Sequence, residues 1–245
     1  MDLTQRIALF NDIRDAYDSS PPRKGYRIWA PEPNPLEPFV KYLSELKQLL
    51  GKLALDEVQN ICDVLYQAYT EERAVYVFGN GGSAALAYHM ASDLGKGTHS
   101  PNSANADIHA IKRFKVLSVT DNVPMITAWA NDSGDENVFA EQIRNFIQPG
   151  DIAFAISSSG YSPKIVQALK TARERQAVTI GLTGFGGGKM LPLLDHALVT
   201  PSESMQQVED VHVIAMHLIF LNFRERFLRL AQVSPDPATA TGVGA

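Results

Sequence analysis

The sequence predicts an α/β protein with three layers, in which a doubly wound, mostly parallel sheet of five strands is preceded by additional helices. Short, almost continuously apolar runs alternate with helical stretches, as expected for strands that are covered on both faces. Two loops rich in glycine and serine each follow such a run and precede a helix. With 245 residues and 45% hydrophobic content, the chain is long enough to bury one substantial core.

The N-terminal part of the chain is predicted to lie outside this core. Residues 1–35 are polar and interrupted by prolines, so we expect a short helix followed by an extended arm. Two helices are predicted next, over 36–50 and 55–70. The first of them carries apolar residues three or four positions apart, as an amphipathic helix does: Phe39, Leu43, Leu46 and Leu50.

The rest of the chain alternates between the two kinds of element. The runs predicted as strands are 74–78, 116–119, 152–156, 178–182 and 197–199. The stretches predicted as helices are 84–94, 136–147, 163–176 and 206–230. The proline-containing tail of small residues is predicted to be disordered. We therefore expect one domain over 36–231, between an arm over 1–35 and a tail over 232–245.

The last predicted helix is apolar on more than one face. One apolar stripe consists of Val208, Val211, Ala215 and Leu218, and another of Val213, Met216, Phe220, Phe223 and Phe227. A helix that is apolar nearly all round should be buried. In a chain of this size we expect the second stripe to pack on another subunit, and therefore expect an oligomer.

Composition argues against several classes of partner. The formal net charge is −5 and the basic residues are spread along the chain, so we expect no nucleic-acid partner. No stretch reaches the ~20 apolar residues of a membrane-spanning helix, and the N-terminus lacks the pattern of a signal peptide. The single cysteine, Cys62, lies in an apolar run and is expected to be a core residue. We expect a cytoplasmic protein with no membrane partner.

Two loops have the composition of a phosphate site. The first is the segment GNGGS at 79–83, and the second is SSSGYSP at 157–163. Because ligands bind at the carboxyl ends of strands in open α/β sheets, and because Ser162 and Pro163 suit the start of a helix, the second loop can receive an anion. Ordinary turns are the alternative interpretation. Neither loop has the spacing of a P-loop or a dinucleotide fingerprint, which favours a small phosphorylated molecule.

Titratable residues gather on the two helices that follow. His89 and Asp93 lie four residues apart and share a helix face. His212 and His217 lie on the last helix, just after Glu209 and Asp210. Such pairs have the spacing of metal ligands, although a surface ion pair for His89 and Asp93, and a satisfied interface histidine for His212 or His217, are the simpler interpretations.

At these residues the chain resembles the phosphoheptose isomerases of the sugar-isomerase (SIS) fold. The resemblance extends over about 36–229. Its motifs, besides the two loops and the His89 helix, are Ala130-Asn131-Asp132, Leu182-Thr183-Gly184, Gly186-Gly187-Gly188-Lys189, Glu209-Asp210-Val211-His212 and His217.

The resemblance implies roles for individual residues. The residues implied in substrate binding are Asn80, Gly81, Gly82, Ser83, Asn131, Asp132, Ser157, Ser158, Ser159, Ser162 and Glu209, with the serines from 157 onward holding the phosphate. The implied ligands of one Zn²⁺ per subunit are His89, Asp93, Glu209 and His217. Asp93 and His217 are also implied in proton transfer, and the subunits are expected to form a homotetramer.

Two positions depart from the family pattern. Asp93 stands where the family has glutamate, and Glu209 stands where it has glutamine. A displacement of about 1 Å can cost about 100-fold in rate, so the shorter Asp93 leaves both ligand and substrate assignments open. On an ideal helix Asp210 lies nearer the face of His217 than Glu209 does.

The expected function is that of an aldose–ketose isomerase that converts D-sedoheptulose 7-phosphate to D-glycero-D-manno-heptose 7-phosphate. Two alternatives remain at this stage. One is a non-catalytic phosphosugar-binding protein that binds the bacterial replication initiator. The other is an isomerase of a different sugar phosphate, because residue spacing does not reveal which hydroxyl groups are recognised.

Overall fold

The computed structural model describes residues 35–97 and 112–233. The predicted arm up to residue 34 and the predicted tail from 234 lie outside the described residues. The chain divides into two compact units, Met1–Leu43 and Ser44–Ala245, and helix α2 (Glu37–Leu50) crosses this boundary. All other described elements belong to the second unit.

A five-stranded sheet forms the centre of the second unit. Its strands are β1 (Val75–Gly79), β2 (Val116–Ser118), β3 (Ile152–Ser157), β4 (Val178–Thr183) and β5 (His196–Val199), in the order β2-β1-β3-β4-β5. Every neighbouring pair is parallel. Because Gly79 pairs with Ile156, the two loops singled out in the sequence leave the same sheet edge from adjacent strands. The predicted fold class is confirmed.

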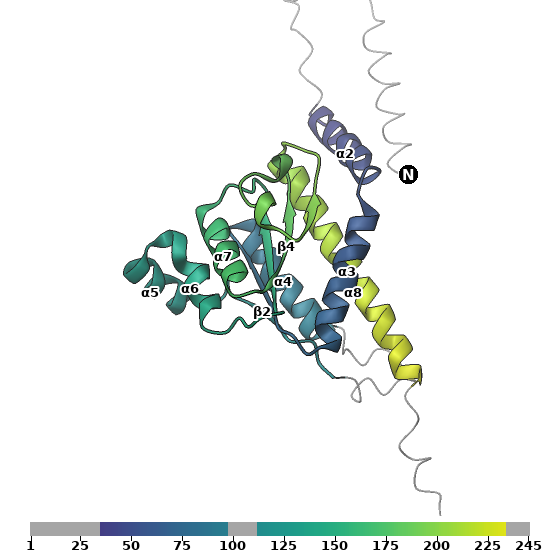
Figure 1. Cartoon of the computed structure of the whole chain (residues 1–245). Coiled ribbons are helices and arrows are strands. Elements are labelled where there is room, and N and C mark those ends of the chain that lie inside the picture. Colours follow the sequence, from purple (N-terminus) through teal and green to yellow (C-terminus); the bar gives the residue numbers. More distant parts are fainter. Residues whose placement is uncertain (1–34, 98–111, 234–245) are drawn as a thin grey trace, which may run out of the picture. The chain divides into compact units, whose positions relative to one another are not determined.

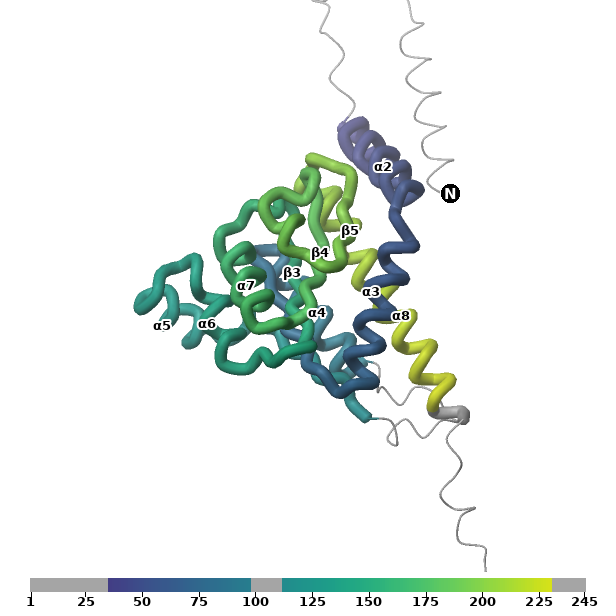
Figure 2. The backbone as a smooth tube through the Cα atoms, in the orientation of Figure 1, coloured from purple at the N-terminus to yellow at the C-terminus, as the bar shows by residue number. Residues whose placement is uncertain are grey.

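Helices cover both faces of this sheet (Figures 1 and 2). On one face, α3 (Leu55–Thr70), α4 (Gly82–Gly95) and α8 (Met205–Val233) share a core with alternate strand residues such as Val77 and Phe154. On the other, α6 (Val138–Arg144) and α7 (Pro163–Glu174) pack with the intervening residues. Helix α8 therefore lies in the same layer as α4, which brings together the two helices that carry the histidines.

The second apolar stripe of α8 corrects an expectation from the sequence. Met216, Phe223 and Phe227 are buried in the core of this same chain. Phe227 packs against Tyr69 of α3, with ring centroids 4.6 Å apart. The expectation that the whole stripe packs on another subunit is wrong, because α3 and the sheet cover opposite sides of α8.

The segment between β2 and β3 contains a helix that was not predicted, since the sequence indicated none between the strand at 116–119 and residue 136. Helix α5 (Val123–Ser133) begins with an Asn122 side chain that accepts a hydrogen bond from the Met125 amide at 3.1 Å. A short 3-10 turn, η3 (Asp135–Asn137), then leads into α6. Asn at the N-cap and Pro124 just after it are start signals that the apolar and β-branched residues of this segment concealed.

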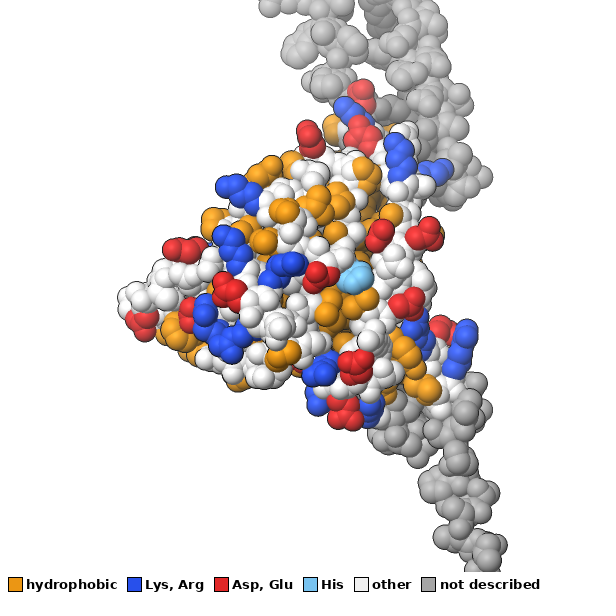
Figure 3. All heavy atoms as spheres, in the orientation of Figure 1, with side chains coloured by type: hydrophobic (Ala, Val, Ile, Leu, Met, Phe, Trp, Pro, Cys, Tyr) orange, Lys and Arg blue, Asp and Glu red, His pale blue; other side chains and the backbone are white. Residues whose placement is uncertain are grey.

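The cysteine and the surface charges agree with the composition. Cys62 is 1% exposed, and burial raises the pKa of its thiol to about 11, so it is a core residue as expected. Acidic and basic side chains are interspersed over the face in Figure 3. Among the described residues, no helix combines the length and apolarity needed to cross a membrane.

Candidate functional site

The loop after β1 is built around glycines. A side chain at Gly79 would lie 2.5 Å from the Ser83 carbonyl oxygen, and Gly81 has a φ of 54°. Only glycine is comfortable in both situations. The turn that results starts α4 at Gly82 and places Asn80 toward the neighbouring loop, where its Nδ2 donates a hydrogen bond to Ser162 Oγ at 2.6 Å.

The loop after β3 folds around its own amides. The Gly160 amide donates to Ser157 Oγ at 3.2 Å, and the Tyr161 amide donates to Ser159 Oγ at 3.3 Å. Ser162 occupies the N-cap of α7 as predicted, but its side chain makes no capping hydrogen bond. The hydroxyl groups that accept from amides keep a proton to donate, and the N-terminus of α7 is free of a side-chain cap. Together these features suit a phosphate.

A glycine-rich segment after β4, residues 184–190, is hydrogen-bonded to the backbone of the serine loop. The Gly184 amide donates to the Ser158 carbonyl at 2.8 Å, and the Met190 amide donates to the Gly160 carbonyl at 3.0 Å. A side chain at Gly188 would lie 2.6 Å from the Ser159 carbonyl oxygen. The backbones touch, so the conformation of the serine loop depends on glycine in the neighbouring segment.

A histidine–carboxylate cluster lies on the facing surfaces of α4 and α8. One ligand atom from each of His89, Asp93 and His217 can be chosen so that all three lie within 4.8 Å of one another. His89 Nε2 is 3.4 Å from Asp93 Oδ2, and the two imidazole rings are 5.3 Å apart at their centroids. Two histidines and one carboxylate are a ligand set that zinc accepts with a position left open.

Glu209 does not belong to this cluster. Its carboxylate lies at the N-terminus of α4, where a side chain added to Gly82 would be 3.1 Å from Glu209 Oε2. His217 lies eight positions after Glu209 on α8, which is about 12 Å along the helix axis. The structure therefore brings together three of the four ligands that the family resemblance implies.

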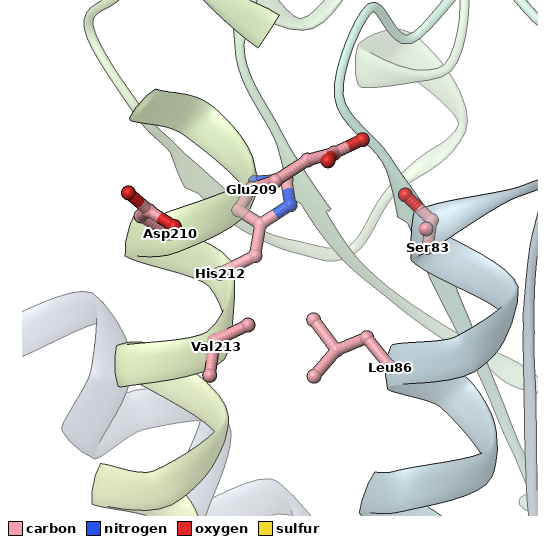
Figure 4. Close-up of a pocket in the computed structure, with 7 residues that line it drawn as sticks. Ser83, Leu86, Glu209, Asp210, His212 and Val213 are labelled. Carbon is pink, nitrogen blue, oxygen red and sulfur yellow. The ribbon is translucent and has the colours of Figure 1, made fainter. Parts of the chain in front are cut away.

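A cavity of about 180 Å³ opens between the first turns of α4 and α8. Its lining residues are Gly82, Ser83, Leu86, Glu209, Asp210, His212 and Val213. Figure 4 shows the Glu209 side chain extending from α8 toward Ser83 on α4. Both acids of the Glu209-Asp210 pair thus line the cavity, and Glu209 is the one at the α4 N-terminus. A carboxylate is favourable at that terminus.

Comparisons with known proteins place these features in a family. Residues 39–184 match the family model for the SIS domain. The phosphoheptose isomerase of Maridesulfovibrio salexigens is 36% identical over 157 residues, which cover 61% of this chain and 68% of that protein. The chain belongs to the SIS-domain family of phosphoheptose isomerases.

Further relatives agree with this membership. Phosphoheptose isomerase 1 of Campylobacter jejuni is 32% identical and aligns over 70% of this chain and 87% of its own length. The solved phosphoheptose isomerase of Neisseria gonorrhoeae superposes with a TM-score of 0.69 at 26% identity and covers 77% of this chain and 98% of that one.

One pair of residues predicted to bind substrate lies apart from the residues on α4 and α8. Asn131 and Asp132 are near the end of α5, in the layer formed by α6 and α7. The Asn131 amide donates to the Asp132 carboxylate at 2.8 Å, and this contact is exposed. Their role in substrate binding remains a prediction.

His212 is the residue of this site that sequence reasoning undervalued. From the sequence, a metal ligand and a satisfied interface histidine are the two interpretations of His212, whereas in the structure it is fully buried within one chain and lines the cavity. Burial lowers the pKa of His212 to about 4, and a weak hydrogen bond with the Thr183 backbone opposes that shift only in part. Its position three residues after Glu209, on the same helical face, was the available signal.

Proposed function

We propose that this SIS-domain chain converts D-sedoheptulose 7-phosphate to D-glycero-D-manno-heptose 7-phosphate. Membership in the phosphoheptose isomerases supports the reaction class and the substrate. The single observation that carries the proposal beyond this likeness is the convergence of His89, Asp93 and His217 next to a cavity at the carboxyl edge of the sheet.

The phosphate binds to the serine loop in this proposal. Each of the two loops leads into a helix whose N-terminus lies at the sheet edge, α4 after the first loop and α7 after the second. The Glu209 carboxylate already lies at the first of them, whereas the second is surrounded by the hydroxyls of Ser157, Ser159 and Ser162. An anion is therefore attracted to α7 and repelled from α4, and this difference orients the substrate.

Proton transfer is assigned to Asp93 and His217. The reaction moves a hydrogen between C1 and C2 through an enediol. Asp93 removes the proton from C1 and returns it to C2, while His217 moves the accompanying proton between the two oxygens. Zn²⁺, held by His89, Asp93 and His217, would stabilise negative charge on those oxygens. The donor set fits this ion.

The enzyme is proposed to be cytoplasmic and to assemble as a homotetramer. Two apolar side chains next to the histidines in the sequence are exposed: Tyr88, which precedes His89, is 57% exposed, and Leu221, one turn after His217, is 48% exposed. Such side chains suit contact with a second copy. The family resemblance supports four copies.

The experiment that tests the function is turnover of sedoheptulose 7-phosphate in D₂O, with zinc and after chelation. We expect metal-dependent formation of the aldose with deuterium at C2, because the base exchanges its proton with solvent. Asp93→Asn should lower kcat by about 100-fold or more while the circular dichroism spectrum is unchanged. The matched control is Asp56→Asn, an exposed acid on α3, which should retain activity.

Two results would contradict this proposal. Wild-type protein that is folded and metal-loaded, yet does not turn the substrate over, would exclude the substrate. Full activity of Asp93→Asn would exclude the role of Asp93 while leaving the reaction in place.

A further inference from the structure

His212 is a buried polar side chain whose hydrogen-bonding capacity is largely unused. It is 0% exposed, and among the described residues neither of its ring nitrogens has a hydrogen-bond partner in good geometry; its contact with the Thr183 backbone is only a weak one. Nearly all buried polar groups in folded proteins have such a partner, from the protein or from water. An imidazole left without one points to a partner that comes from outside the chain.

The surroundings of the ring define where this partner must be. His212 lines the cavity between α4 and α8 together with the Ser83 and Glu209 side chains. Figure 4 shows its ring projecting from α8 on the side that carries Glu209 and faces α4. With a volume of about 180 Å³, the cavity holds several groups of the size of water, which occupies about 30 Å³ in the liquid.

The charge state of the ring defines the chemistry of the partner. With a pKa lowered to about 4 by burial, the imidazole is neutral near pH 7 and offers one N–H donor and one acceptor nitrogen. A hydroxyl group, which can both donate and accept, matches it. A phosphate would match only the donor, and the Glu209 carboxylate, which lines the same cavity, already makes it unfavourable for an anion.

From this geometry we infer that His212 binds a hydroxyl group of the sugar chain and thereby contributes to the choice of substrate. The inference rests on the proposed function, since it takes the cavity as the place where the sugar lies. It assigns His212 to substrate binding and not to proton transfer. Ser83, whose hydroxyl faces the same cavity, lies on the opposite wall (Figure 4).

The test uses three variants of the full chain and steady-state kinetics with sedoheptulose 7-phosphate. His212→Phe keeps a planar ring but removes donor and acceptor, so KM should rise at least tenfold with a smaller change in kcat. His212→Gln restores one donor and one acceptor and should recover most of this loss. Thr171→Val replaces a buried hydroxyl on α7, 1% exposed and away from the cavity, and should leave KM unchanged.

Thermal unfolding separates binding from a merely structural role. If His212 binds substrate, the free His212→Phe protein melts no lower than wild type, because an unsatisfied polar group has been replaced by an apolar one. The increase in melting temperature on adding sugar phosphate should shrink in the variant. An unchanged KM and an unchanged ligand-induced increase in His212→Phe would overturn the inference.

A wild-type protein that is inactive on sedoheptulose 7-phosphate would refute the proposed function but would not end the test of His212. The ligand-induced increase in melting temperature is then measured with a panel of ketose and aldose phosphates of five to seven carbons. Stabilisation of wild type that His212→Phe loses would support the role of His212 with another sugar. No stabilisation of wild type, or equal stabilisation of both proteins, would refute it.

Discussion

At the scale of single residues, glycines decide the shape of the phosphate loop. Gly160 has a φ of 70°, and a side chain there would lie 2.2 Å from the Gly187 carbonyl oxygen. The serine hydroxyls can face a phosphate only while the two backbones remain in contact. The loop is thus positioned by residues that carry no functional group.

Gly160→Ala should therefore lower the free energy of unfolding by about 2–4 kcal/mol and raise KM for the sugar phosphate. Gly186→Ala is the matched comparison, since Gly186 has a φ of 71° but nothing within 4 Å of the added carbon. That variant should lose only about 1 kcal/mol. Denaturant unfolding of both variants measures the difference. Equal losses in the free energy of unfolding would mean that the contact with Gly187 does not contribute to stability.

The buried imidazole of His212 makes stability depend on pH. Its pKa is lowered by burial to about 4 in the folded chain, from the ordinary value of 6.5. Between these two pH values the unfolded chain binds a proton that the folded chain does not bind, so stability falls as the pH falls, by up to about 1.4 kcal/mol per pH unit. Above pH 6.5 this residue contributes no slope.

His212→Phe should remove this contribution. The free energy of unfolding of wild type and variant, measured with chelator present at pH 7, 6, 5 and 4, should diverge in favour of the variant toward low pH. Parallel pH profiles would show that the buried histidine is not neutral in the folded chain.

At the scale of elements, α4 and α8 together form the candidate metal site. They lie side by side on one face of the sheet, and each contributes at least one histidine to the cluster. Neither helix alone has three ligands. A metal ion would therefore fasten one helix to the other and stabilise the layer that they form.

Zinc should stabilise the folded protein by about 2.7 kcal/mol when free zinc is 100-fold above its dissociation constant. His89→Gln should abolish most of this effect, and His196→Gln, a substitution in β5 outside the cluster, should not. Thermal unfolding with and without chelator measures it. Zinc stabilisation that survives in His89→Gln would place the metal elsewhere.

At the scale of the whole molecule, exposed apolar residues lie next to the candidate active site. Tyr88 and Leu221 flank the histidines, although most of the second apolar stripe of α8 is used within the chain. The apolar surface available for contact between subunits is therefore smaller than the whole second stripe of α8, which the sequence analysis expected to lie there.

Light scattering should give a mass of four chains of 26.9 kDa each. Leu221→Glu should lower that mass, because a charge would be buried at the contact between subunits. Phe146→Glu, a change at an exposed position on the opposite layer, is the matched control. A wild-type protein that remains monomeric at micromolar concentration would contradict the homotetramer.

The sequence by itself determined the sheet, the two loops and the residue types of the site. Strand periodicity, the glycines at 79–82 and the Ser162-Pro163 helix start are local signals, and each concerns residues that are close along the chain. The partial exceptions, α5 and the start of α6, lie where capping signals compete with apolar and β-branched residues.

Only the tertiary structure decided which distant residues meet. It brought His217 of α8 to His89 and Asp93 of α4, placed Glu209 at the α4 N-terminus, and buried His212 with no hydrogen-bond partner in good geometry among the residues that the structure describes. These outcomes depend on how two helices more than a hundred residues apart pack on one sheet. Helical spacing specifies which side chains share a face, but it does not specify what that face will meet.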